Sequence, residues 1–310
     1  MGWLGKLFGK GTKGDEAVGG GVMPVPAPPE APIAVAAPEP AGDVVEMAAS
    51  EPVVEVPAAE VVAAFTALAL PGVRLDLVPG VPVPEAAVSS LGGRPSLPAD
   101  LDWPEEGGVP MLFLAQVNYA DMPPLDGFPA SGLLSVFVAD DATHGCAFPS
   151  VNGQGFRCFY FEDPAALVRR AAPAAPVSDD VLSSALRAEG VTLTGQAFDA
   201  LPGLVTREAE AALKTLEDAG VTVDEGALED WLQSGGQVAL AYGGYPSFAQ
   251  GDVRAGQYRF YARPLLVVAS FTEGALSAAW GDMGAGNFLM KPKDMEPLHA
   301  NRALYYYDSY

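Results

Sequence analysis

The stretch Y-G-G-Y-P-S at residues 242–247 has a near copy earlier in the chain, L-G-G-R-P-S at residues 91–96. Each copy precedes a strongly apolar run, at residues 111–117 and 265–271 respectively. Glycine permits positive φ angles, and a residue that precedes proline is pushed towards extended geometry. Each copy is therefore predicted to be a tight turn from which an extended segment begins. The alternative is two unrelated surface turns, since Gly and Pro are common in loops.

Composition narrows the class of protein. The chain has 310 residues, a formal net charge of −22 and a pI of about 4.2. This balance argues against nucleic-acid binding, which depends on Lys and Arg contacts to phosphate. The two cysteines, Cys146 and Cys158, form no C-x-x-C pair, which favours a reducing cytoplasm, although a disulfide between them stays open. No apolar run approaches the roughly 18 residues of a membrane span, and the N-terminus lacks a secretory signal pattern.

The first 57 residues differ from the rest of the chain. Residues 1–13 are basic and carry Trp3, Leu4, Leu7 and Phe8 at helical spacing. Such a segment suits weak peripheral contact with a membrane surface or a partner, and a frayed terminus is the alternative. Residues 14–57 are rich in Pro, Ala and Glu and contain no Lys or Arg, which is typical of a disordered tether.

The remaining residues, 58–310, are predicted to fold as one domain with two β-rich halves. A short helix is expected after Pro57, ending before Pro71-Gly72. The first half spans residues 73–161, and its strands are expected at 73–77, 110–117, 132–139 and 156–161 as an antiparallel meander.

Residues 163–235 are predicted to form a helical insert. Helices are expected at 180–189, after a Thr206 cap as far as Gly220, and after Asp224. The second half spans residues 236–310, with strands expected at 257–262, 265–271, 286–290 and 302–308, and with residues 276–280 leading into the turn W-G-D-M-G. The predicted fold class is α+β: β-dominated, mostly antiparallel, with two related β-rich halves, a helical insert and a disordered N-terminal tether.

Residues 73–308 resemble the YwqG-like family of bacterial proteins. The resemblance rests on the order and spacing of several words: L-G-G-R-P-S-L-P (91–98), W-P (103–104), P-M-L-F-L-A-Q-V (110–117), G-L-L-S-V-F-V (132–138), Y-G-G-Y-P-S-F-A-Q-G-D (242–252) and W-G-D-M-G-A-G-N-F (280–288). It implies a β-dominated α+β fold with two related halves and no established catalytic activity. The N-terminal 60 or so residues lie outside it.

The resemblance also bears on function. The family is distantly similar to eukaryotic proteins that chaperone a newly made ribosomal protein and carry a G-G-x-P turn and a strand containing Gln. Their zinc-binding cysteines are absent here. The resemblance therefore implies a scaffold that binds protein or peptide, without identifying the client.

Catalytic signatures are weak. Neither histidine, His144 nor His299, belongs to a nucleophile motif, and structural roles are favoured. His144 and Cys146 beside Asp140 and Asp141 match no familiar zinc spacing, so no metal and no cofactor is expected.

Three further features have both a functional and a structural interpretation. Gln116 is predicted to be buried and bonded to neighbouring backbone. Asp282, in the turn W-G-D-M-G, either organises a ligand-facing loop or bonds its own turn, and the second is favoured. The run Tyr305–Tyr307 is predicted to pack one side in the core. Its other side is either a binding face or packed as in an ordinary terminal strand, and the second is favoured.

These observations favour a non-enzymatic, cytoplasmic module that binds a protein or an extended peptide, with a basic one favoured by the net charge. The alternatives are a carboxylate-dependent hydrolase and an accessory or immunity protein that sequesters a toxin. The oligomeric state stays open. The binding or architectural positions predicted from the sequence are Gly92, Gly93, Pro95, Gln116, Gly243, Gly244, Pro246, Trp280, Gly281 and Asp282.

Overall fold

One large antiparallel sheet organises the fold. The computed structural model describes residues 57–310 except 152, 175–180 and 236–237, so the predictions for the basic segment and nearly all of the tether lie outside the described residues. The described residues belong to a single unit, Pro52–Tyr310. In sheet order the eleven strands are β8 (Ser150–Val151), β17 (Leu304–Asp308), β16 (Ala285–Met290), β13 (Arg263–Ala269), β12 (Leu240–Gly243), β1 (Leu70–Val78), β11 (Val191–Ala200), β2 (Ser90–Leu91), β6 (Leu112–Asn118), β7 (Leu133–Val138) and β9 (Phe156–Phe161).

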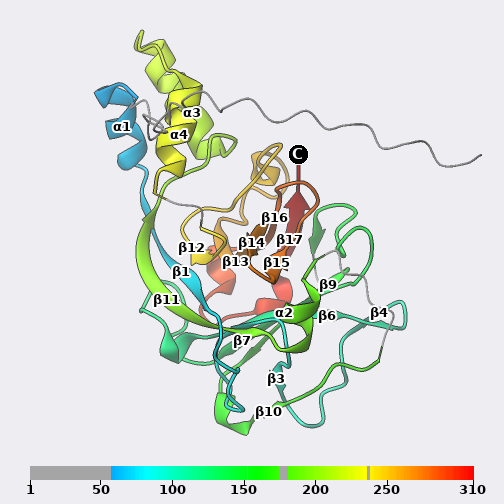
Figure 1. The fold of residues 1–310 in the computed structure, drawn as a ribbon. Helices are drawn as coiled ribbons and strands as arrows, with labels where there is room; N and C mark the ends of the chain where they lie inside the picture. The colour runs from blue at the N-terminus through cyan, green and yellow to red at the C-terminus, as the bar shows by residue number, and fades with distance from the viewer. Residues whose placement is uncertain (1–56, 152, 175–180, 236–237) are drawn as a thin grey trace, which may run out of the picture. The chain divides into compact units, whose positions relative to one another are not determined.

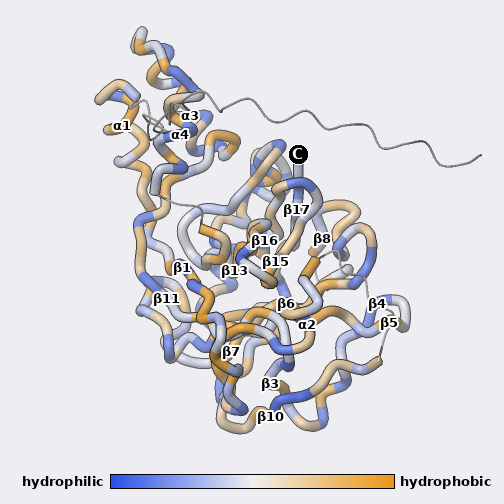
Figure 2. Tube along the Cα trace, viewed as in Figure 1, coloured by the Kyte–Doolittle hydropathy of each residue, from blue (hydrophilic) through white to orange (hydrophobic). Residues whose placement is uncertain are grey.

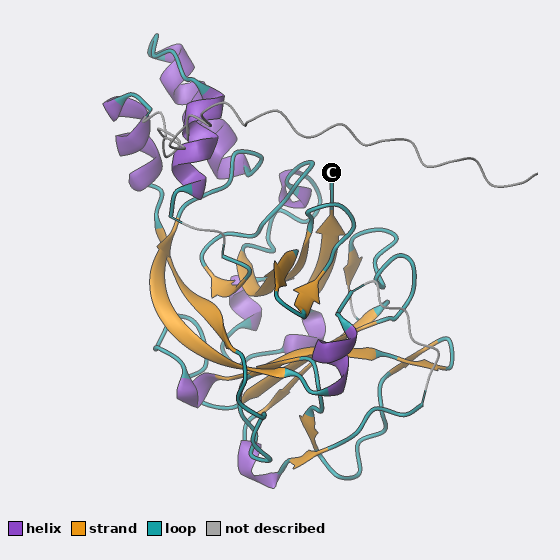
Figure 3. Ribbon diagram, in the orientation of Figure 1, coloured by secondary structure: helices purple, strands orange, loops and turns teal. Residues whose placement is uncertain are grey.

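The sheet curls strongly, as Figures 1 and 3 show. Its two edge strands, β8 and β9, are close in sequence, with only residues 152–155 between them. Four intervening residues make five Cα–Cα steps, which span at most about 18 Å, so the two edges are near each other. Aromatic rings from both edges fill the interior: Phe156 of β9 lies 5.5 Å from Tyr305 of β17, and Tyr305 stacks on Phe288 at 4.6 Å. The predicted inward side of the tyrosine run is therefore confirmed for Tyr305.

The opposite face of β6 and β7 carries a second apolar cluster. Phe113 and Phe137 lie under Trp103, whose indole Nε1 donates to the Met111 carbonyl at 3.0 Å. Figure 2 shows the apolar character of these strands. Because both faces are covered, all six residues of β7 are buried. This explains why β7 has a continuous apolar sequence instead of an alternating one.

Three helices form a separate small core. The helices α1 (Ala59–Thr66), α3 (Arg207–Asp218) and α4 (Glu225–Gln233) pack through Val61, Phe65, Ala209, Leu216 and Leu228. Figures 1 and 3 show them grouped beyond one end of β1 and β11.

The predicted helix starts are confirmed. The Thr206 hydroxyl accepts from Ala209 N at 3.3 Å, and the Asp224 carboxylate accepts from Ala227 N at 3.0 Å. A further short helix, α2 (Ser184–Ala188), lies within the predicted range 180–189.

Three sequence-based predictions are wrong. Of the antiparallel meander predicted for the first half, only β6, β7 and β9 are consecutive neighbours, because β11 and β2 lie between β1 and β6. The predicted helical insert contains β11, which pairs with β1 from Leu70↔Ala200 to Val78↔Thr192, in the middle of the sheet. The predicted strand at 257–262 is a run of turns, in which Arg259 N donates to Gly256 O at 3.2 Å and Tyr261 N donates to Tyr258 O at 2.9 Å. Local turn bonds therefore prevail over the aromatic composition that favoured a strand there.

Short ribbons complete the described structure: β3 (Ser96–Leu97) with β10 (Val168–Arg169), β4 (Glu105–Glu106) with β5 (Val109–Pro110), and β14 (Phe271–Glu273) with β15 (Leu276–Ala278). Single turns of 3-10 helix lie at Tyr119–Asp121, Pro164–Ala166, Val253–Ala255, Pro292–Asp294 and Ala300–Arg302.

Candidate functional site

Both Gly-Gly turns adopt backbone conformations that favour glycine. Gly92 and Gly93 have φ angles of 66° and 75°, and Gly243 and Gly244 have φ angles of 69° and 57°. Space is also restricted: a Cβ on Gly92 would lie 2.2 Å from the Leu186 carbonyl oxygen. The turn is bonded on both sides, since Gly92 N donates to Leu114 O at 2.8 Å and Gly93 N donates to Leu186 O at 2.7 Å. The first turn is thus locked against both β6 and α2.

A buried amide side chain holds the segment after each turn. In the first, Ser96 N donates to Gln116 Oε1 at 2.9 Å, and the Gln116 amide nitrogen donates to the Val88 carbonyl. In the second, Ser247 N donates to Asn287 Oδ1 at 2.9 Å, and Asn287 Nδ2 donates back to Ser247 O at 2.7 Å. Backbone groups therefore satisfy Gln116, as predicted. Asn287 was missed, although it lies in the motif that follows Trp280.

The prolines of both turns, Pro95 and Pro246, are buried. The strands beside the two turns pair in the same way. At the first turn, Leu91 pairs with Ala115, and the register of β6 shifts between Phe113 and Ala115. At the second turn, Tyr242 directly follows the Ala241↔Val267 pair, and the register of β13 shifts between Pro264 and Leu266. The turns therefore occupy similar positions in their strand pairs.

The turn W-G-D-M-G has a buried and an exposed part. Trp280 is fully buried, with its ring 5.9 Å from Tyr307 and 5.8 Å from His144. Gly281 and Asp282 are exposed, and it is the Asp282 main-chain carbonyl that accepts a hydrogen bond, from Tyr310 N at 3.0 Å. Trp280 is a core residue, whereas Asp282 lies at the surface.

Hydrogen bonds within the loop that carries His144 and Cys146 have a structural role. Burial raises the pKa of Asp141, but bonds from Thr143 and Gly145 outweigh burial and leave this pKa below its usual value. Burial raises the pKa of Cys146 to about 11, and both cysteines are free. A thiol with this pKa is a weak nucleophile at neutral pH. Within the described part of the chain, His, Cys, Asp and Glu side chains nowhere gather in threes at a spacing that would hold a metal ion.

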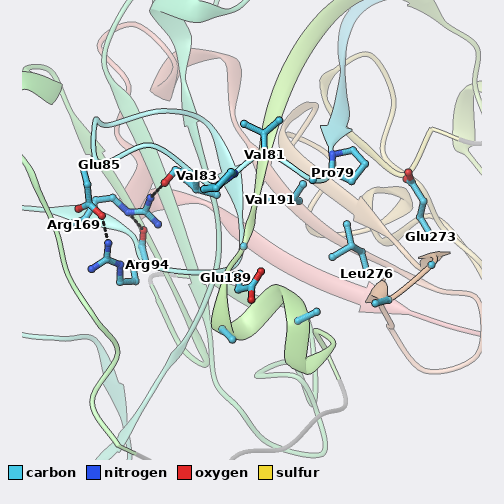
Figure 4. A pocket seen from close by; sticks show the side chains of 17 residues that line it. Pro79, Val81, Val83, Glu85, Arg94, Arg169, Glu189, Val191, Glu273 and Leu276 are labelled. Atoms are coloured by element: carbon cyan, nitrogen blue, oxygen red, sulfur yellow. Dashed lines mark hydrogen bonds and ion pairs between the residues drawn. The ribbon is translucent and has the colours of Figure 1, made fainter.

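A trough of about 900 Å³ lies beside the first turn (Figure 4). Five segments line it: the loop 79–85 that follows β1, Arg94 of the first turn, Arg169 of β10, the stretch from α2 to Val191 at the start of β11, and the β14–β15 hairpin. Bonds between α2 and β15 fix the last wall, since Ser183 N donates to Ser277 O at 2.9 Å and Ala279 N donates to Val181 O at 2.9 Å.

Arginines form one end of the trough. Arg169 Nη1 donates to Val83 O at 2.8 Å and to Pro84 O at 2.6 Å, and Arg169 Nε donates to Arg94 O at 3.2 Å. Arg169 thus ties the loop 79–85 to the first turn. Arg94 forms an ion pair with Glu85. Burial, and next the charge of Arg94, lower the pKa of Arg169.

The rest of the trough is apolar and then acidic. Figure 4 shows Val81, Val83 and Val191 between the arginine cluster and the far end, where Glu273 lies beside Pro79 and Leu276. Glu189, at the end of α2, adds a carboxylate between the two ends. The lining therefore has two arginines, one of them paired with Glu85, at one end, an apolar middle beside Glu189, and Glu273 at the other end.

None of the ten positions predicted from the sequence lines this trough in the described structure. Gly92 and Gly93 do not line the trough but pack against Leu186 and Glu189 beside it. Arg94, from the same motif, lines the trough. Arg169 and Glu273 were missed because only long-range folding brings them to the same trough as Arg94.

The comparison with family models gives one match. Residues 89–309 match the model of a family described as a domain of unknown function (DUF1963). The chain belongs to this family. The DUF1963 range runs from just before β2 to the end of β17, so it includes both turns, Arg94, Arg169 and the β14–β15 hairpin, whereas the loop 79–85 precedes it. A search of curated proteins found no match. None of the described helices combines the length and apolar character needed to cross a bilayer.

Proposed function

We propose that this protein is a non-enzymatic module whose DUF1963 domain binds an extended peptide in the trough beside the first Gly-Gly turn. The observation that carries the proposal is the trough itself, with about 900 Å³ of volume and a lining that changes from basic through apolar to acidic. This volume is at the upper end of the range typical of ligand sites. An apolar middle with charged ends suits a chain molecule that presents apolar and charged groups in sequence.

The chemistry of the lining favours binding over covalent catalysis. Among the described residues that line the trough, none is Ser, Thr, Cys, His, Lys or Tyr, the side chains that most often act as nucleophiles or as bases towards a nucleophile. Three glutamates, Glu85, Glu189 and Glu273, are the acids available to a carboxylate-dependent hydrolase. Glu85 is already paired with Arg94. The hydrolase alternative therefore remains as an outcome of the experiment.

The net charge of −22 supports a basic partner. Long-range attraction accelerates the encounter of oppositely charged molecules, and salt weakens that attraction. We also infer that the protein is cytoplasmic, an inference that two free cysteines support.

The proposal includes two related β-rich halves and membership of the YwqG-like group. The similar register beside the two turns, the matching bulges in β6 and β13, and the buried amide behind each turn support a duplication. One difference between the halves is that the amide comes from β6 in the first and from β16 in the second. In this proposal the first half has acquired a ligand site to which β14 and β15 of the second contribute.

The experiment fills the trough. Ala188 lines it at the exposed end of α2, so Ala188→Trp adds a large ring there without disturbing a buried residue. Ala211→Trp, on the exposed face of α3, is the matched control. The full chain and both variants are immobilised and exposed to a synthetic hexapeptide library, and retained peptides are quantified by mass spectrometry.

The proposal expects a subset of peptides that the wild type and A211W retain and A188W loses by at least about tenfold, which is about 1.4 kcal/mol. Equal retention by all three proteins would overturn it. Cleavage of the retained peptides, abolished by E189Q or E273Q, would favour the hydrolase.

A further inference from the structure

The two ends of the trough differ in charge, which gives a bound peptide a direction. Arg94 and Arg169 lie together at one end, and Glu273 lies at the other, with Val81 and Val191 between them (Figure 4). A peptide bound in one direction would bring a negative group to the arginines and a positive group to the acids. The reverse direction would place like charges together at both ends, which is unfavourable.

The arginine end can receive an anion without rearrangement of its support. Three bonds to main-chain carbonyls hold the Arg169 guanidinium in place. Among the described residues, the Arg94 side chain is joined only to Glu85, whose side chain is 75% exposed, so the pair is a surface ion pair of small worth. An incoming carboxylate can therefore replace or join Glu85. The repulsion between two neighbouring arginines, which contributes to the lowered pKa of Arg169, would be relieved by a bound anion.

The kind of anion follows from the other charges. A phosphate group with nearly two negative charges would face Glu85, Glu189 and the overall charge of −22. A single carboxylate is less strongly repelled and fits the planar geometry of guanidinium groups. An extended peptide ends at its terminal carboxylate, so this group can lie at the end of a trough with no further residue to accommodate.

We propose that the trough binds the C-terminal end of a peptide. The terminal carboxylate lies between Arg94 and Arg169, an apolar side chain packs against Val81 and Val191, and a Lys or Arg side chain further from the C-terminus approaches Glu273. This inference rests on the proposed function, because it specifies which part of a peptide occupies the same trough.

The test compares paired synthetic hexapeptides that share a sequence and differ only in a free C-terminal carboxylate or a C-terminal amide. A third set carries an internal phosphoserine with a C-terminal amide. The mixture is applied to the immobilised full chain, and the ratio of retained forms is measured by mass spectrometry. The wild type should retain the carboxylate forms about tenfold over the amides, because charge-assisted hydrogen bonds to the two arginines are lost in the amide.

Three variants assign the charges. Arg94→Gln should reduce the carboxylate preference about tenfold, whereas Glu85→Gln, which removes only the competing acid, should preserve or increase it. Glu273→Gln should leave the carboxylate preference intact and lower the enrichment of Lys and Arg about three- to fivefold. Arg94, Glu85 and Glu273 are all outside the cores, so a urea unfolding curve that matches the wild type confirms that each variant is folded.

The outcomes separate the two proposals. Retention of carboxylate and amide forms in equal amounts, both lost in A188W, would overturn the C-terminal proposal and leave peptide binding intact. A preference for the phosphoserine set would also overturn it, in favour of a phosphopeptide ligand. Retention of no peptide above the A188W level would overturn both.

Discussion

Asp252 is expected to be one of the most sensitive positions for stability outside the apolar cores. It lies in the second motif, after the turn, and its carboxylate accepts from Arg254 Nε at 2.9 Å and Arg254 Nη2 at 2.6 Å. It also accepts from Arg207 N, at the start of α3, at 3.0 Å. The Arg254 side chain is only 2% exposed, and in the described part of the chain it has one other acid partner, Glu208, at 2.7 Å. This network joins the helical cluster to the loop before β13.

Asp252→Ala should lower the free energy of unfolding by about 3–5 kcal/mol, because it leaves a buried guanidinium with one partially exposed acid instead of two acids. For a unit of this size, about 2–4 °C of melting temperature correspond to each kcal/mol, so Tm should fall by about 6–20 °C. Urea unfolding followed by circular dichroism measures the change directly. Asp218→Ala is the matched control: it removes an exposed pair with Lys214 and should cost less than about 1 kcal/mol.

A double variant tests the mechanism. Asp252→Ala combined with Arg254→Met removes the uncompensated charge, so it should be more stable than Asp252→Ala alone. A loss below about 1 kcal/mol in Asp252→Ala, or a double variant whose loss is the sum of the two single losses, would refute the reasoning.

The same network sets a pH dependence. Burial raises the pKa of Asp252, but bonds to Arg254 and Arg207 outweigh burial and lower it below the ordinary carboxyl value. A carboxyl group with a lowered pKa in the folded state stabilises the fold fully above the ordinary pKa of about 3.9. That stability decreases as the pH falls from about 4.5 through the lowered pKa. The loss on acidification should therefore be smaller in Asp252→Ala than in the wild type when both are unfolded in urea across this range.

Other predictions follow from single sites. Gly92→Ala should destabilise by about 2 kcal/mol or more, measured by urea unfolding, because it combines a positive φ with a contact at 2.2 Å; Gly220→Ala, with a positive φ and open space, should cost less. Gln116→Leu should cost about 1–3 kcal/mol by the same measurement, because Ser96 N would lose its buried acceptor. Cys146 should react with a thiol reagent at neutral pH far more slowly in the native protein than in urea, since burial raises its pKa to about 11, and a fast native reaction would contradict this.

Features with local causes were predictable from the sequence. The helix starts at Thr206 and Asp224 depend on one side chain and the following turn, and both were found. The bonds of Gln116 to backbone were predicted because a buried amide has few alternatives. Strands β6, β7 and β9 have apolar sequences long enough to indicate burial, and they were predicted within a few residues.

Features that depend on distant partners were not predictable. The sequence of β11, V-T-L-T-G-Q-A-F-D-A, lies between segments rich in Ala, Leu and charges, and only its pairing with β1 and β2 makes it a central strand. The segment 257–262 shows the opposite case, because its aromatic residues suit a strand while its turns prevent one. In both cases tertiary context decided the outcome.

The site illustrates the same difference between local and distant causes. Glycine turns can be found from sequence because their conformation is a property of a few adjacent residues. The trough cannot, because Arg94, Arg169 and Glu273 come from three separate parts of the chain, and loop 79–85 joins them through Arg169. The role of the first turn is geometric, because it holds α2 and β6 close together. Any ligand role belongs instead to the side chains that this close packing brings to one surface. Substitutions at Gly92 or Gly93 should therefore impair stability and binding together, whereas substitutions at Arg94 or Glu273 should change binding alone.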